Sequence, residues 1–189
     1  MKITTYILRK LFSKKYLYLL LIILSSCLKA QTVNAGGSGW TVSVPAITEA
    51  GNNYGGTYAS ATNAIILSGT MPGSFLNLLS NGAARISMRY TPTTWNNSLR
   101  LYAKRSGGTA TINGLCIGCT ATVNGGTTYI EMLQSPDTAF CTINFSGLLG
   151  LGNSVNYSAI NVQLQISGVS VTIPAASYSA QIVFTIGPN

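Results

Sequence analysis

Short segments in which apolar and polar residues alternate recur along this chain, and they constrain its fold more than any other feature. Clear examples are 40–44 (Trp-Thr-Val-Ser-Val), 85–90 and 99–104. Alternation with a period of two is typical of a strand that buries one face. Turn residues separate these segments at intervals of about 8–12 residues, and helix-forming stretches are scarce. We therefore predict an all-β, antiparallel β-sandwich of the Ig-like kind with about nine short strands.

Two hairpins are expected within this sandwich. Asn124-Gly125-Gly126 is a hairpin signal between 120–123 and 127–133. The strands 85–90 and 99–104 are expected to pair across the loop 91–97. The remaining predicted strands are 64–67, 139–145, 160–166, 169–173 and 178–186. No linker is evident, so residues 31–189 are predicted to form a single domain.

The first 30 residues have the pattern of a secretory signal peptide. A basic region precedes the apolar run Tyr16–Leu24, and small residues lead to Ala30. The apolar run is shorter than the roughly 20 residues of a membrane-spanning helix. The Ala30–Gln31 junction resembles signal-peptidase sites of a large group of gram-negative bacteria. We therefore expect a secreted protein, found outside the cell or on the surface of such a bacterium.

An alternative processing route remains open. Leu24-Ser25-Ser26-Cys27 resembles a lipobox. Lipidation of Cys27 would then anchor the protein to a membrane, the only membrane contact we expect.

The net charge of the whole chain is misleading. It is +8, but six of the 11 basic residues lie within residues 1–30. Residues 31–189 keep five basic residues against three acidic ones, a net charge of +2. A nucleic-acid partner is therefore not expected.

The chain is poor in groups that perform catalysis. It has no histidine, and its acids are Glu49, Glu131 and Asp137. Strand alternation gives no reason for two of these carboxylates to converge, as glycoside hydrolysis requires. Cys116-x-x-Cys119 lacks the histidine that could complete a zinc site. We predict that the protein is not an enzyme and has no cofactor and no bound metal.

Three cysteines remain after removal of the signal peptide, in an oxidising compartment. Alternation places Cys119 and Cys141 on inward faces and Cys116 outside. We predict a Cys119–Cys141 disulfide with Cys116 free, which requires the two strands to lie in different sheets. A local Cys116–Cys119 disulfide is the alternative.

A candidate binding surface follows from the second predicted hairpin. Its outward face would combine cationic groups with aromatic rings, which suits an anionic envelope or extracellular polysaccharide. Charges on a solvated sheet face also have a purely structural explanation. The candidate residues are Arg85, Arg89, Trp95, Arg100, Tyr102 and Lys104.

A modification site is also a candidate. Asp137-Thr138-Ala139 resembles the Asp-Ser/Thr-aliphatic O-glycosylation site of the same bacterial group, which would make Thr138 the acceptor. The aspartate has its own structural explanation in a Pro-Asp turn.

The C-terminal segments carry a resemblance to a family. Residues 162–174 and 176–186, with Ser177-Tyr178 before the last strand, resemble the end of secreted bacterial pilin-like and spore-coat-U-like sandwiches. The segments 47–54 and 95–101 resemble a group of uncharacterised secreted proteins. The resemblance implies a fimbrial or coat-like subunit that self-associates or joins other surface subunits in cell adhesion. One departure is that residues 31–39 are short and Gly-rich, whereas chaperone–usher subunits donate a hydrophobic N-terminal strand.

Two functions remain in consideration. The first is a non-catalytic structural or adhesive subunit, pilin-like or coat-like. The second is a monomeric surface- or glycan-binding module that uses the basic and aromatic sheet face.

Overall fold

The computed structural model describes residues 18, 30–45, 53–54, 56–72, 82–114, 116, 118–147 and 154–189. The chain divides into two units, Met1–Ala30 and Gln31–Asn189. Only Tyr18 and Ala30 of the first unit are described, so the predicted signal peptide and Cys27 lie outside the described residues. No helix in the described part of the chain is long and apolar enough to cross a membrane.

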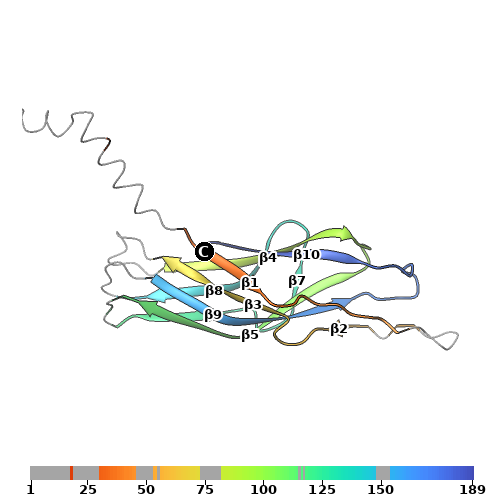
Figure 1. The fold of residues 1–189 in the computed structure, drawn as a ribbon, viewed down its shortest axis with the longest axis horizontal. Coiled ribbons are helices and arrows are strands. Elements are labelled where there is room, and N and C mark those ends of the chain that lie inside the picture. Colours follow the sequence, from red (N-terminus) through yellow and green to blue (C-terminus); the bar gives the residue numbers. More distant parts are fainter. Residues whose placement is uncertain are drawn as a thin grey trace, which may run out of the picture. The chain divides into compact units, whose positions relative to one another are not determined.

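The second unit is an antiparallel β-sandwich, which confirms the predicted fold class (Figure 1). Sheet A has the order β1-β3-β9-β5-β7, with β2 paired to β9, and sheet B has the order β10-β4-β8-β6. The strands are β1 (Thr32–Gly36), β2 (Tyr58–Ala59), β3 (Ile65–Pro72), β4 (Gly82–Thr94), β5 (Arg100–Asn113), β6 (Thr120–Asn124), β7 (Ile130–Met132), β8 (Thr138–Ser146), β9 (Ser154–Ser167) and β10 (Ser179–Pro188).

Both predicted hairpins are wrong, because the chain changes sheets at each of these turns. β4 pairs with β8 and β10, whereas the next strand, β5, pairs with β7 and β9. Likewise β6 pairs with β8 in sheet B, and β7 pairs with β5 in sheet A. A crossover allows each strand to bury its apolar face against the opposite sheet, an arrangement that local alternation cannot distinguish from a hairpin.

Two predicted strands do not join a sheet. Residues 40–44 form no strand, and among the described residues their backbone makes no hydrogen bond, yet Trp40 and Val42 pack against the core. Residues 169–173 form a turn after β9 instead of a separate strand. The alternation in 40–44 therefore reflects a segment that covers the core, since burial of alternate side chains does not require a ladder partner.

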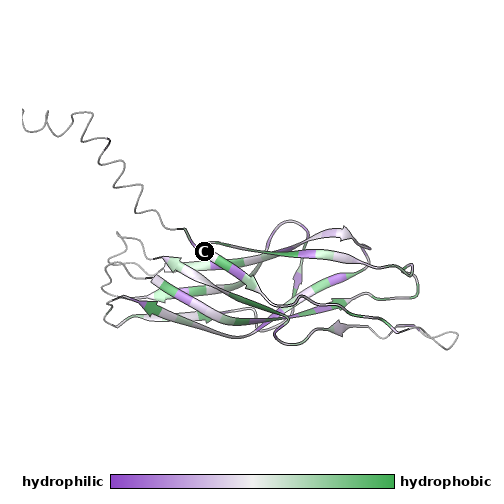
Figure 2. Ribbon diagram, in the orientation of Figure 1, coloured by the Kyte–Doolittle hydropathy of each residue, from purple (hydrophilic) through white to green (hydrophobic). Residues whose placement is uncertain are grey.

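The core lies between the two sheets. Hydrophobic and hydrophilic residues alternate along the strands, as predicted (Figure 2). Ile86, Met88 and Tyr90 of β4 are buried, as are Leu101 and Ala103 of β5. Each fully buried large aliphatic side chain contributes roughly 1.5–3 kcal/mol relative to its exposed state. The sandwich is therefore stabilised mainly by contact between its two apolar sheet faces.

Arg105 of β5 holds the β6–β7 crossover through hydrogen bonds. Its backbone N–H donates to the carbonyl of Gly126 at 2.5 Å, and its guanidinium donates to the carbonyls of Gly125, at 2.7 Å, and Gly107. Gly125 and Gly126 have positive φ angles of 78° and 72°, which favour glycine. The predicted Asn-Gly-Gly turn is thus used for a crossover that one arginine holds in place.

We expect Arg105→Lys to lower the free energy of unfolding by about 1–2 kcal/mol, because an ammonium cannot reproduce the planar guanidinium contacts with several carbonyls. Urea denaturation measures the effect. Arg85→Lys is the matched control, since Arg85 is exposed and its guanidinium makes no hydrogen bond within the described residues. Equal stability of the two variants would contradict the role of Arg105.

Candidate binding pocket and sheet edge

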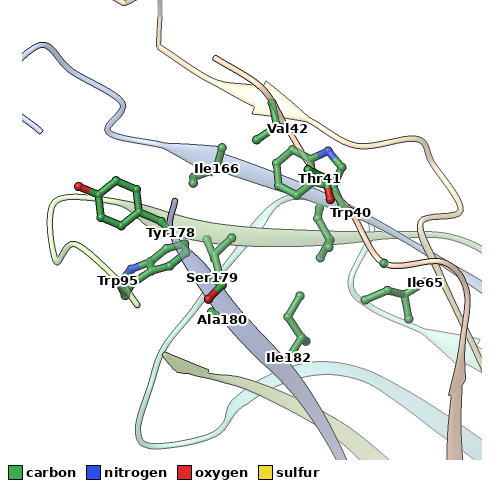
Figure 3. A pocket seen from close by; sticks show the side chains of 13 residues that line it. Trp40, Thr41, Val42, Ile65, Trp95, Ile166, Tyr178, Ser179, Ala180 and Ile182 are labelled. Atoms are coloured by element: carbon green, nitrogen blue, oxygen red, sulfur yellow. The ribbon is translucent and has the colours of Figure 1, made fainter. Parts of the chain in front are cut away.

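A pocket of about 400 Å³ opens between the two sheets at one end of the sandwich. Its apolar floor includes Leu101 of β5 with Leu164 and Ile166 of β9, all three buried. Its walls come from the unpaired segment 39–42 and from the start of β10 (Figure 3). This volume lies within the range of small-molecule sites in proteins.

Three aromatic side chains line the pocket, with Trp40 across from Trp95 and Tyr178 (Figure 3). The indole N–H of Trp95 donates to the carbonyl of Leu99 at 3.2 Å, and the ring lies 5.4 Å from that of Tyr90. The hydroxyl of Tyr178 donates to the carbonyl of Pro174 at 2.7 Å. These contacts hold two of the rings in place before any ligand arrives.

The polar groups at the pocket are neutral. They include the exposed hydroxyls of Thr41 and Ser179, neither of which has a hydrogen-bond partner among the described residues. No charged side chain belongs to the described lining. The prediction from sequence included Trp95 but missed Trp40 and Tyr178, because only the fold brings them to one place.

A second feature is the open edge of β10. This ten-residue strand pairs with β4 along one side, and no described strand pairs with its other side, although β1 lies nearby. It contains no charged residue. Soluble proteins usually protect such an edge with charges, prolines or bulges. Here Pro188 stands at the very end and the register shift lies between Ser179 and Ala180, so most of the edge is unprotected.

The predicted basic surface is not formed as one patch. Because β4 and β5 belong to different sheets, Arg85 and Arg89 lie on the outer face of sheet B, whereas Arg100, Tyr102 and Lys104 lie on the outer face of sheet A. Trp95 follows the end of β4, belongs to neither outer face and lines the pocket.

Most of these cations also have partners. Arg89 pairs with Asp137 at 2.8 Å and Arg100 with Glu131 at 2.6 Å. The ammonium of Lys104 lies 4.7 Å from the ring centre of Tyr129. Ion pairs and cation–π contacts within the chain leave less charge for an anionic ligand.

Asp137, in the turn before β8, binds side chains of β4 and of the edge strand β10. One carboxylate oxygen accepts from Arg89 of β4, and the other accepts from the hydroxyl of Thr185 of β10 at 2.8 Å. The hydrogen bond from Arg89 and then that from Thr185 lower the pKa of Asp137.

The position of Thr138 contradicts an accessible glycosylation site. Its hydroxyl oxygen is buried and has no hydrogen-bond partner in the described residues. A glycan at this atom would have no space in the folded protein, since neighbouring atoms cover the oxygen completely. The neighbouring Asp137 has the structural role described above.

The cysteine pairing is the alternative one. Cys116 is bonded to Cys119, and Cys141 is a buried free thiol, so the preferred Cys119–Cys141 disulfide is wrong. β6 and β8 lie in the same sheet, and their register places Cys119 beside Gly147. Six residues along β8 separate that point from Cys141, roughly 20 Å. A disulfide needs Cα atoms within about 7 Å.

Comparisons with known proteins gave no match to a family model, to a curated protein or to a solved structure. Within the described residues, no three Cys, Asp or Glu side chains gather where they could hold a metal ion. The pocket and the β10 edge are therefore the features from which a function can be argued.

The lowered pKa of Asp137 predicts a stability that depends on pH. Its pairing stabilises the fold above the unfolded pKa of about 3.9, and this contribution is lost as the pH falls through the lower folded pKa. Asp137→Asn should lower the urea midpoint at pH 6, by an amount worth under about 1 kcal/mol for so exposed a pair. The variant should also lose less stability than the wild type between pH 5 and pH 2.5. Parallel pH profiles would refute this role.

The cysteine assignment predicts one reactive thiol in residues 31–189, and only after unfolding. Burial raises the pKa of Cys141 to about 11, so iodoacetamide at pH 8 should leave the native protein unmodified. In urea without reductant, mass spectrometry should find Cys141 alkylated and a peptide linked through Cys116 and Cys119. A peptide linked through Cys119 and Cys141 would overturn the assignment.

Proposed function

We propose that the protein is a secreted, non-catalytic structural or adhesive subunit of a bacterial surface, and that copies associate through β10. The observation that carries the proposal is the ten-residue, uncharged edge of β10, whose outer side pairs with no described strand and can therefore accept a strand of another copy. Two such edges related by a two-fold axis would pair antiparallel and join two copies of sheet B into one larger sheet.

The side chains of β10 support this proposal. Ile182, Phe184 and Ile186 pack against the core of their own chain, so they already hold the strand in an extended conformation. Phe140 of β8 lies against Phe184, with ring centres 6.0 Å apart. A strand that is ordered before association loses little conformational entropy when it pairs with a partner.

The N-terminal strand β1 is paired within its own chain, which agrees with association through β10 instead. β1 (Thr32–Gly36) pairs along its length with β3 of the same chain, and the hydroxyl of Tyr157 donates to the carbonyl of Thr32. This part of the chain is thus engaged in its own sheet. The pilin-like or spore-coat-U-like resemblance is compatible with the sandwich, and we propose edge pairing as the route of association.

The rival function, a glycan-binding module on the basic and aromatic sheet face, has less support. Its residues lie on two outer faces and in the pocket, and Arg89 and Arg100 are paired with carboxylates. An anionic glycan would have to separate these pairs to gain their charge.

Charges on β10 should prevent association. The double substitution Gln181→Glu and Val183→Glu places two carboxylates on the outward face of this strand, where antiparallel self-pairing brings like charges together. We expect dimers or larger assemblies of the wild type in size-exclusion chromatography with light scattering and in electron microscopy. The variant should be monomeric under the same conditions.

Asn144→Glu is the matched control. Asn144 lies on β8, which is paired on both sides by β4 and β6, so a carboxylate there cannot disturb edge pairing. Association of the control with dissociation of the β10 variant supports the proposal. A wild-type protein that stays monomeric at 100 μM or above, or a control that dissociates equally, would refute it.

A further inference from the structure

The pocket between the two sheets combines aromatic rings and neutral polar groups in a way that selects one class of ligand. Its volume is about 400 Å³, and its described lining has no charged side chain. A charged ligand would be buried there without an ion-pair partner, which is strongly unfavourable. The ligand must therefore be neutral.

A wholly apolar ligand does not suit the pocket either. The hydroxyls of Thr41 and Ser179 are exposed at the pocket and have no hydrogen-bond partner among the described residues, so they are available to a polar ligand. A hydrocarbon would make no hydrogen bond with either hydroxyl. A ligand that carries its own hydroxyl groups would make these bonds in addition to its contacts with the aromatic rings.

An extended peptide would need a continuous ladder of backbone partners, and both walls interrupt it. On one wall Gly39 has a φ of +73°, which turns the backbone away from an extended conformation. On the other wall the register of β10 shifts between Ser179 and Ala180, opposite Pro92 and Thr94 of β4. Strand addition is therefore disfavoured at the pocket, although β10 continues regularly beyond it.

We propose that this pocket binds a neutral pyranose ring of a saccharide. The C–H face of the ring packs on Trp95 and Tyr178, which hydrogen bonds to Leu99 and Pro174 hold in place. The ring of Trp40 closes the opposite wall, and the sugar hydroxyls bind the hydroxyls of Thr41 and Ser179 (Figure 3). This site is separate from the sheet faces, and it does not depend on association through β10.

The test uses methyl β-D-glucopyranoside, methyl α-D-mannopyranoside and methyl β-D-galactopyranoside as probes, with glucuronate as a charged comparison. Saturation-transfer NMR detects binding, and quenching of tryptophan fluorescence gives the dissociation constant. We expect at least one neutral glycoside to bind and glucuronate to bind at least tenfold more weakly.

Variants connect binding to the pocket. Thr41→Val with Ser179→Ala should weaken the bound glycoside about tenfold, since two hydroxyl contacts are lost. Trp40→Ala should abolish binding, and circular dichroism verifies that it folds. Ser43→Ala, on an exposed residue of the same segment, should bind as the wild type does.

Three results would overturn the proposal. They are failure of all three neutral glycosides to bind, tighter binding of glucuronate than of any of them, and unchanged affinity in the Thr41 and Ser179 double variant. Both binding measurements can be made on monomeric and on assembled protein. The test of saccharide binding is therefore independent of the association test on β10.

Discussion

Contact between the apolar faces of two sheets is the constraint on which the rest of this structure depends. Six of the ten strands contain buried residues, and buried residues such as Ile86 and Leu164 need a second apolar layer opposite them. A hairpin keeps consecutive strands in one layer, whereas a crossover supplies both layers. The crossovers β4–β5 and β6–β7 place consecutive strands in both layers, and Arg105 stabilises the second of them with hydrogen bonds to backbone carbonyls.

The same crossovers determine which side chains lie on the outer sheet faces and which line the pocket. Arg85 and Arg89 lie on one outer face, and Arg100 and Lys104 lie on the other. Arg89, Arg100 and Lys104 contact Asp137, Glu131 and Tyr129 respectively. The β4–β5 crossover also carries Trp95 to the end of the sandwich, where Trp40 and Tyr178 join it. The β4–β5 crossover thus both separates the basic residues and brings Trp95 to the other two aromatic rings. These two results favour a neutral ligand in the pocket and an uncharged contact edge over an anionic glycan on a sheet face.

Much of the fold could be predicted from the sequence. The alternation in 85–90 and 178–186 indicated strands, and the inward positions of Ile86 and Met88 were correct. Pairing could not be predicted, because an alternating segment has the same pattern in any register and beside any partner. Cys119 and Cys141 show the consequence. Both residues occur in strand-like sequence, but the β6–β8 register places them far apart and leaves Cys116 as the neighbour of Cys119.

By itself, the sequence determined the class of structure, the small net charge of residues 31–189 and the scarcity of acid–base groups, since these follow from local pattern and composition. Only the tertiary structure decided which strands are neighbours, where the pocket opens and which edge has no described strand beside it. Trp40, Trp95 and Tyr178 are separated by up to 138 positions in the chain, and nothing local links them. The physical reason is that hydrophobic burial is non-directional, so it selects an inward face for each strand without specifying the strand that lies beside it.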